Sequence, residues 1–364
     1  MKPRLMPEPI MRTPATWNRF TARLGALALA TMANLAAAQP MSMGVAELSG
    51  VVEGDGPITL FYPSRDPAQT LRRGPFELQG APRGEPVRGN GRLVVLSHGS
   101  GGSPWTYTAL AQVLVRAGYL VAVPDHVGDN HRDLSDAGPR SWERRPLEVS
   151  RAIDAVQQSP RFGPLVDAAR VGVWGMSAGG HTALTLAGGR WSRERLLAHC
   201  EANLDEDWSA CTGARTEPGS GFWFGIQRAI ARFLIRQNLG GDPRELGHVD
   251  PRIGAIVAGV PVAADFDLAT LVTPRVPLAV TEGPQDRWLV PRFHSGALLA
   301  ACASCERLDA PPGAGHGALL DPPPPGLPPR IHKLLDDPPG FERAALPDYY
   351  ARVVAFFNRN LLAP

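Results

Sequence analysis

The sequence predicts an α/β protein with a doubly wound, mostly parallel sheet and a helical cap insertion. Short apolar runs bounded by turn residues alternate with segments of helical spacing, which is typical of a parallel sheet covered by helices on both faces. The segment 190–248 interrupts this alternation and is the predicted cap. With 364 residues, 44% of them hydrophobic, the chain is long enough for one large domain with an insertion.

Residues 1–38 predict an export signal peptide. Five basic residues precede the apolar stretch 24–38, which ends in alanines. This stretch is shorter than the roughly 20 residues that a membrane helix needs. We therefore expect cleavage after Ala38, an α/β domain over 39–364, a periplasmic or secreted location and no stable membrane anchor after cleavage. An uncleaved anchor is the alternative.

Charge and cysteine content narrow the choice of partners and compartment. The formal net charge of +2 provides no strong field for nucleic acid, so no nucleic-acid partner is expected. Four cysteines (Cys200, Cys211, Cys302 and Cys305) agree with an oxidising compartment and disulfide bonds. They allow three pairings, of which the two local ones, 200–211 and 302–305, are the simplest.

The first half of the chain predicts the start of the sheet. Two short strands, 45–53 and 57–62, are followed by a Gly-, Pro- and Arg-rich segment, 63–91, that we expect to be a surface excursion. Apolar runs and helical spacing then predict strand 92–96, helix 105–117, strand 119–123, helix 147–157 and strand 170–175.

The second half continues the alternation on either side of the cap. Its predicted elements are helix 178–188, strands 254–258, 276–281 and 306–308, and helices 293–301 and 349–361. Within the cap, a helix at about 221–238 has an apolar side formed by Phe222, Ile226, Ile230, Phe233 and Leu234. We expect this side to pack on the domain; a lid over an apolar substrate and docking on a membrane surface are alternatives.

Ser177 is the predicted nucleophile. It is the serine of a GxSxG motif, 175–179, which follows a predicted strand and opens a predicted helix. A tight strand-to-helix turn of this kind lifts a serine hydroxyl above the sheet and places it at a helix N-terminus. The alternative, a helix-capping serine in an ordinary turn, does not require the flanking glycines.

A serine nucleophile needs a base and a carboxylate that orients it. His316 lies in a glycine-rich loop after the last predicted strand and is the expected base; His181, His199 and His294 lie in helices or the cap. Asp286 follows strand 276–281 and gives the chain order Ser, Asp, His.

Three other carboxylates compete for the role of the triad acid. Asp265 and Asp267 follow the earlier strand 254–258, and Glu282 lies closer to the end of strand 276–281 than Asp286 does. They remain alternatives.

The two oxyanion donors are expected to be backbone N–H groups of Ala178, the residue after the nucleophile, and Ser100, in the loop after strand 92–96. His98, Trp105 and Met176 are the candidates for lining the substrate pocket. We expect His98 to support the loop rather than to react, and helix packing is an equal alternative for Trp105.

A second group of polar residues follows strand 119–123. Asp125, His126, Asp129 and His131 offer metal-ligand types, but their irregular spacing favours a hydrogen-bonded loop beside the pocket. The sequence predicts no metal and no cofactor.

Three segments of the chain resemble a known family. VVLSHGSGGSPWTYTALAQVLVRAGYLVAVPDH, RPLEVSRAIDAV and ARVGVWGMSAGGHTALTLAGG resemble bacterial dienelactone-hydrolase-like proteins related to platelet-activating-factor acetylhydrolases, and the likeness extends over about residues 45–360. The resemblance implies an α/β-hydrolase fold and cleavage of carboxylic esters without metal or cofactor. It also implies the triad positions for Ser177, Asp286 and His316.

Together, these observations predict a serine hydrolase that cleaves a small-molecule ester with a short to medium acyl chain through an acyl-enzyme. A lipase or polyester hydrolase and an amidase or peptidase are alternatives, because the same triad serves all of them. A hydrolase-like binding protein is the non-enzymatic alternative.

Overall fold

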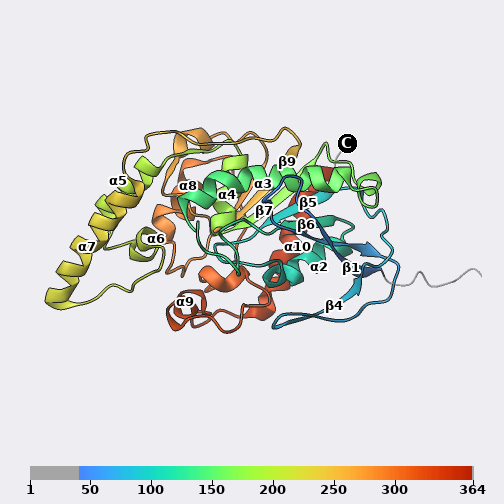
Figure 1. Ribbon diagram of the computed structural model, residues 1–364, viewed down its shortest axis with the longest axis horizontal. Coiled ribbons are helices and arrows are strands. Elements are labelled where there is room, and N and C mark those ends of the chain that lie inside the picture. Colours follow the sequence, from blue (N-terminus) through green and yellow to red (C-terminus); the bar gives the residue numbers. More distant parts are fainter. Residues whose placement is uncertain (1–40, 363–364) are drawn as a thin grey trace, which may run out of the picture. The chain divides into compact units, whose positions relative to one another are not determined.

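A computed structural model of the chain describes residues 41–362, which belong to one compact unit. The expected signal peptide and its cleavage site lie outside the described residues. The unit is built on a ten-stranded sheet in the order β12-β11-β9-β7-β5-β6-β2-β1-β4-β3 (Figure 1). The strands in chain order are β1 (Ser42–Leu48), β2 (Ile58–Ser64), β3 (Gln69–Arg73), β4 (Phe76–Pro82), β5 (Leu93–Ser97), β6 (Leu120–Pro124), β7 (Val171–Met176), β9 (Ile253–Gly259), β11 (Leu278–Thr281) and β12 (Glu306–Arg307).

The parallel half of the sheet positions the site. β6, β5, β7, β9, β11 and β12 pair in parallel, and β2 joins them antiparallel to β6. Every residue of β5, β6 and β7 is buried, because helices cover both faces of these strands. Parallel strands end at the same edge, so the loops after β5, β7, β11 and β12 lie together there.

The predicted surface excursion at 63–91 is wrong in part. β3 and β4 form an antiparallel hairpin that extends the sheet, with Leu71 and Leu78 directly paired and buried. Most of the remaining side chains of this hairpin are exposed or half-buried, which gives it the polar composition of a loop.

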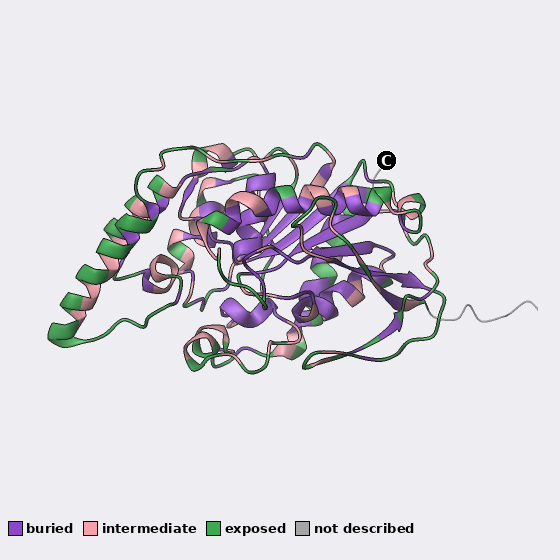
Figure 2. Cartoon of the chain, viewed as in Figure 1, coloured by how far each residue is buried: buried purple, intermediate pink, exposed green. Residues whose placement is uncertain are grey.

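Two helical layers enclose the sheet (Figure 1). One layer holds α3 (Pro139–Gln158), α4 (Ala178–Leu186) and α8 (Ser295–Ala301); the other holds α2 (Thr108–Arg116) and α10 (Leu346–Phe357). Each layer packs on its own face of the sheet, so the apolar core is divided into two clusters (Figure 2). α3 begins at Pro139 rather than at the predicted 147. A short helix, α9 (Pro329–Leu335), ends the proline-rich segment 321–329.

The cap contains α5 (Arg193–Asn203), α6 (Trp208–Thr212) and α7 (Gly221–Leu239). A disulfide between Cys200 and Cys211 joins α5 to α6, and a second disulfide joins Cys302 to Cys305 after α8. A two-stranded sheet of β8 (Arg190–Trp191) and β10 (Phe266–Asp267) lies at the base of the cap. Over residues 41–362, none of the helices combines the length and apolar character required to span a membrane.

The prediction that the apolar side of α7 packs on the domain is wrong. Phe222, Ile226, Ile230, Phe233 and Leu234 are all exposed, by 40–79%. α7 packs on the cap through its other side, where Ile235 and Leu239 are buried.

Candidate active site

Ser177 lies at a strained turn between β7 and α4. Its backbone has φ 59° and ψ −118°, a conformation that residues with a side chain rarely adopt. A β-carbon on Gly175 would stand 2.0 Å from the carbonyl oxygen of Gly179, and one on Gly179 would stand 1.9 Å from that of Ser97. The motif therefore requires both glycines, because the strand, the turn and the helix approach one another too closely for any side chain.

His316 reaches the nucleophile from the loop after β12. Its Nε2 lies 2.9 Å from Oγ of Ser177, and its ring is only 2% exposed. The next residue, Gly317, faces the backbone of α9: a β-carbon there would stand 1.9 Å from the carbonyl oxygen of Leu335. The glycine allows the loop to pass beneath α9 and bring the imidazole to Ser177.

Asp286 completes the line from the loop after β11. Its Oδ2 lies 2.7 Å from Nδ1 of His316. Its Oδ1 accepts hydrogen bonds from the backbone N–H groups of Trp288 and Leu289, each at 2.8 Å. These bonds fix the carboxylate, which in turn fixes the imidazole with its Nδ1 protonated and its Nε2 free to take the serine proton.

The competing carboxylates have other partners. Asp265 is buried and contacts Nε2 of His181 at 3.0 Å. Asp267 pairs with Arg195 and Glu282 with Arg307. The structure therefore brings only Asp286 of the four candidates to His316.

The loop after β5 faces Ser177 with its backbone. A β-carbon on Gly99 would stand 3.4 Å from Cβ of Ser177, so the loop passes directly beside the nucleophile. Among residues 41–362, no backbone or side-chain group accepts a hydrogen bond from the N–H of Ser100 or from that of Ala178, the first residue of α4. Two donors near a reacting carbonyl can hold the negative oxygen of a tetrahedral intermediate.

A buried ion pair fixes this loop. Oδ1 of Asp129 accepts hydrogen bonds from Oγ of Ser100 at 2.5 Å and from the N–H of Gly101 at 3.1 Å. Its Oδ2 accepts from Arg145 at 2.8 Å and from Ser141 at 2.7 Å. Arg145, which has no exposed surface, also donates to the carbonyl oxygen of His98, the residue that begins the loop.

The charge of Asp129 is retained despite its burial. Burial alone would raise the pKa of this carboxyl, but Arg145 and the hydroxyls of Ser100 and Ser141 outweigh it and lower the pKa to about 2. An ionised carboxylate is needed here, because a protonated one could not accept all of these hydrogen bonds.

Both ring nitrogens of His98, which was a candidate for lining the pocket, already have backbone partners and are not free to contact a substrate. Its Nδ1 contacts the carbonyl oxygen of Gly99 at 2.8 Å, and its Nε2 accepts from the N–H of His126 at 3.2 Å. His126 in turn contacts Ser97 and Glu148 in a second serine–histidine–acid set. Ser97 and His126 have no exposed surface, so this set serves as a buried support for the loop after β5.

Two candidates for the pocket lie elsewhere. The ring of Trp105 packs edge-on against Phe61, with the guanidinium of Arg73 over it. Met176 is 2% exposed, and its Sδ accepts from the hydroxyl of Tyr107 within the core. The side chain of Met176 therefore packs in the core, and that of Trp105 packs partly buried against it.

The sequence reasoning missed the half-buried Trp288, whose ring lies 5.2 Å from that of His316. It also missed Arg145 and Glu148, which support the loop from α3. With Ser141 they follow a spacing of four and three residues, which is one face of a helix, and this is the signal that could have indicated them.

A cluster of metal-ligand types lies where His199 and Asp207 of the cap meet His294 at the start of α8. Both imidazoles contact Oδ2 of Asp207 through Nε2, at 2.8 and 2.9 Å. Nδ1 of His294 accepts a hydrogen bond from the N–H of Ala263, so the ring carries its proton on Nε2. A metal would need that nitrogen deprotonated, and the cluster therefore fits a hydrogen-bonded network.

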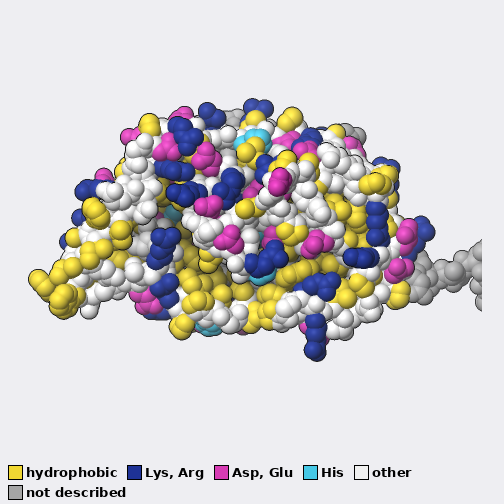
Figure 3. Space-filling view, in the orientation of Figure 1, with side chains coloured by type: hydrophobic (Ala, Val, Ile, Leu, Met, Phe, Trp, Pro, Cys, Tyr) yellow, Lys and Arg dark blue, Asp and Glu magenta, His cyan; other side chains and the backbone are white. Residues whose placement is uncertain are grey.

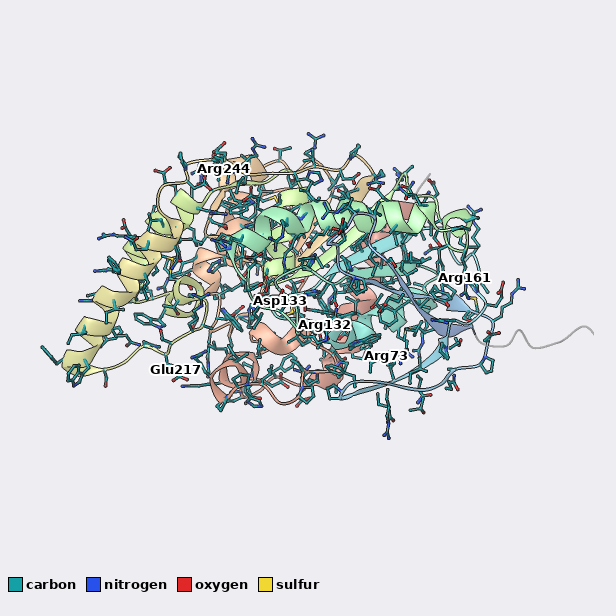
Figure 4. All side chains as sticks on the ribbon, viewed as in Figure 1. Arg73, Arg132, Asp133, Arg161, Glu217 and Arg244 are labelled. Atoms are coloured by element: carbon teal, nitrogen blue, oxygen red, sulfur yellow. A yellow bond between two sulfur atoms is a disulfide. The ribbon has the colours of Figure 1, made fainter. Side chains whose placement is uncertain are left out.

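The cluster after β6 also forms a hydrogen-bonded loop, of which Arg132 and Asp133 are marked in Figure 4. Asp125 pairs with Arg132, and the N–H of His131 donates to the carbonyl oxygen of Gly102. This loop thus joins the hydrogen-bond network that holds the loop after β5.

The sequence model of the prolyl oligopeptidase family matches residues 105–193, a segment that includes Ser177 but neither Asp286 nor His316. A comparison with curated proteins found no significant match. Among solved structures, a ferulic acid esterase from Streptomyces cinnamoneus is similar, with a TM-score of 0.57 and 19% identity over 90% of this chain and 92% of that one.

The chain has the α/β-hydrolase fold. The parallel sheet, the serine turn after β7 and the order Ser177, Asp286, His316 on loops at one edge agree with it. The α/β-hydrolase fold alone hosts many activities, so the reaction has to be argued from the site.

Proposed function

We propose that the protein is a serine hydrolase that cleaves carboxylic esters with short to medium acyl chains. The observation that carries the proposal is the hydrogen-bonded line from Ser177 through His316 to Asp286. We also propose that the chain is related to dienelactone-hydrolase-like proteins and platelet-activating-factor acetylhydrolases. We further propose that it is exported to the periplasm or the medium. The pairing of all four cysteines in two disulfides supports an oxidising destination.

The proposed reaction has two matched halves. Oγ of Ser177 attacks the ester carbonyl carbon as its proton passes to Nε2 of His316, and the carbonyl oxygen becomes negative between the N–H groups of Ser100 and Ala178. His316 then gives the proton to the alcohol oxygen, the C–O bond breaks and the alcohol leaves an acyl group on Ser177. A water molecule then attacks the acyl carbon with His316 as the base, and the acid leaves Ser177.

A second candidate activity is cleavage of amides or peptides. The match of residues 105–193 to the prolyl oligopeptidase family favours it, and the same triad can cleave an amide. The half-buried indole of Trp288 beside His316 offers an aromatic surface, which makes aryl esters such as feruloyl esters worth including in an assay.

The test is a substrate panel with the purified protein. It comprises p-nitrophenyl esters from acetate to decanoate, methyl ferulate, and peptide p-nitroanilides, each assayed with the wild type and with Ser177→Ala. We expect turnover of the shorter esters that is lost in Ser177→Ala. Turnover of anilides alone would transfer the assignment to the peptidase, and undiminished activity in the variant would overturn the proposed nucleophile.

A further inference from the structure

The outer side of α7 is a continuous apolar surface. Six side chains form it, with exposed fractions of 79% for Phe222, 74% for Trp223, 40% for Ile226, 55% for Ile230, 61% for Phe233 and 50% for Leu234. At 100° per residue these positions fall within about a third of the helix circumference. They cover the end of the described body at which α7 lies, seen on the left in Figure 3.

The cap holds α7 with this side outward. On the inner side Phe224 stacks on Trp208 with ring centroids 5.5 Å apart, and Ile235 and Leu239 join the core. Arg228 pairs with Asp205, and Arg236 pairs with Glu201 on α5. Because the inner side already has its contacts, the helix cannot bury its outer side on its own domain unless it rotates about its axis.

The segments that flank α7 are also tied down. The loop before it carries Glu217, marked in Figure 4, which pairs with Lys333 of α9. Behind it, the disulfide Cys200–Cys211 braces α5 against α6. α7 therefore follows a loop that is paired with α9 and packs beside two helices that a disulfide joins.

The spacing of the exposed side chains has an approximate twofold symmetry. Measured along the helix from position 228, Ile226 mirrors Ile230, Trp223 mirrors Phe233, and Phe222 mirrors Leu234. An antiparallel copy of the same helix therefore places an apolar side chain opposite each apolar side chain. This self-complementarity is what an isologous contact between two identical subunits requires.

The area agrees with a pair of copies. Aromatic side chains offer about 150–250 Å² each, so with the three aliphatic side chains the exposed apolar surface is roughly 500–600 Å² per chain. Two copies would bury roughly 1,000–1,200 Å², which reaches the lower end of stable interfaces. A surface of this size is at the upper end of the range for a monomer, where the largest apolar patch is about 300–600 Å².

The charges around α7 disfavour an anionic membrane as the occupant. Arg228 and Arg236 pair with Asp205 and Glu201 of the cap on the inner side of the helix, so these two arginines are not available to anionic headgroups. A second copy brings apolar groups to the surface without requiring any free charge.

We propose that α7 is the contact between two copies of this chain, packed antiparallel about a twofold axis that crosses the outer side of the helix at the level of position 228. Such a dimer covers all six exposed apolar side chains. Each subunit keeps its own Ser177, His316 and Asp286. The inference stands on the cap alone and does not depend on the proposed ester hydrolysis.

The first test is the mass of the purified protein in solution, by sedimentation or light scattering at about 1–100 µM. We expect twice the mass of one chain. Ile230→Asp places a charge at the centre of the contact and should give a monomer with an unchanged circular dichroism spectrum. Asn238→Asp, at an exposed position off the apolar surface, should remain a dimer.

Cysteine pairing tests the antiparallel register. Ile226→Cys mixed with Ile230→Cys should form a disulfide-linked pair under mild oxidation, whereas Phe222→Cys mixed with Ile230→Cys should not. A monomeric wild type at 100 µM, or an oligomer that Ile230→Asp leaves intact, overturns the proposal. So does a monomer that floats with phosphatidylcholine vesicles, because the surface would then face lipid.

Discussion

Oδ2 of Asp286 lies 2.7 Å from Nδ1 of His316, and its other oxygen is held by two backbone N–H groups. This carboxylate therefore fixes the tautomer and orientation of the base. Replacing it with an amide, Asp286→Asn, should lower kcat by about 10³–10⁴-fold, because the imidazole then loses its oriented proton and the balance of its charge. Steady-state kinetics on a p-nitrophenyl ester measure the effect.

Asp267→Asn is the matched control for Asp286→Asn. Asp267 follows the earlier strand β9, is half-buried, and pairs with Arg195 outside the triad. Its variant should retain wild-type kcat within a factor of about two. A large loss in Asp267→Asn with little in Asp286→Asn would assign the acid to the other loop.

Asp129 positions the oxyanion loop through Ser100 and Gly101. In Asp129→Asn the charge that Arg145 balances is gone, and the loop donors are held less firmly. Loss of an oxyanion donor costs about 10²–10³-fold in kcat, so a loosened donor should cost about 10–100-fold. KM should change little, because the donors act mainly on the transition state.

Stability is the second readout for Asp129→Asn. Leaving Arg145 buried without its partner should lower the free energy of unfolding by about 3 kcal/mol. Denaturant titration measures it. If KM rises and kcat stays constant, Asp129 acts on the binding of substrate and not on the oxyanion donors.

Acidification should destabilise the protein through two buried histidines. Burial lowers the pKa of His98 and of His126 well below 6.5, and in each case the charge of Arg145 adds to the effect. Below pH 6.5 the unfolded chain takes up protons at these positions and the folded chain does not, so stability falls as pH falls. The slope is up to about 1.4 kcal/mol per pH unit for each group.

The comparison of wild type with His126→Gln isolates this contribution. Burial raises the pKa of Glu148, which opposes the trend, but this residue is present in both proteins. Denaturant titrations at pH 7.5, 6.5 and 5.5 should show a shallower loss of stability in His126→Gln. Parallel curves for the two proteins would mean that His126 does not contribute.

Glycine-to-alanine substitution should have opposite effects in the turn at Ser177 and in α7. Gly179→Ala places a β-carbon 1.9 Å from a backbone oxygen and should abolish activity and lower the melting temperature. Gly225→Ala in α7 meets nothing within 4 Å and should stabilise the helix by about 1 kcal/mol. Equal melting temperatures for the two variants would contradict the geometry of the turn.

Much of the arrangement could be predicted because it depends on local pattern. The alternation of apolar runs with helical segments predicted the parallel half of the sheet, and the loops after its strands carry Ser177, Asp286 and His316 to one place. The hairpin of β3 and β4 was not predicted, because its buried side has a single pair of large apolar residues, Leu71 and Leu78, and so lacks an apolar run.

Other features depend on contacts that no local pattern records. The apolar side of α7 was predictable, but a helix periodicity does not tell which surface covers that side. The pair Asp129–Arg145 joins a loop to α3, and each residue taken alone resembles an ordinary surface charge. Such buried pairs become visible only when the fold places the partners together.

The most direct test of the account is to locate the residue that a fluorophosphonate modifies. The wild type and His316→Ala are each treated with the probe and digested, and the peptides are analysed by tandem mass spectrometry. The account predicts a single adduct on Ser177 in the wild type and almost none in the variant, since the hydroxyl then lacks its base. An adduct on another serine, or equal labelling of both proteins, would contradict it.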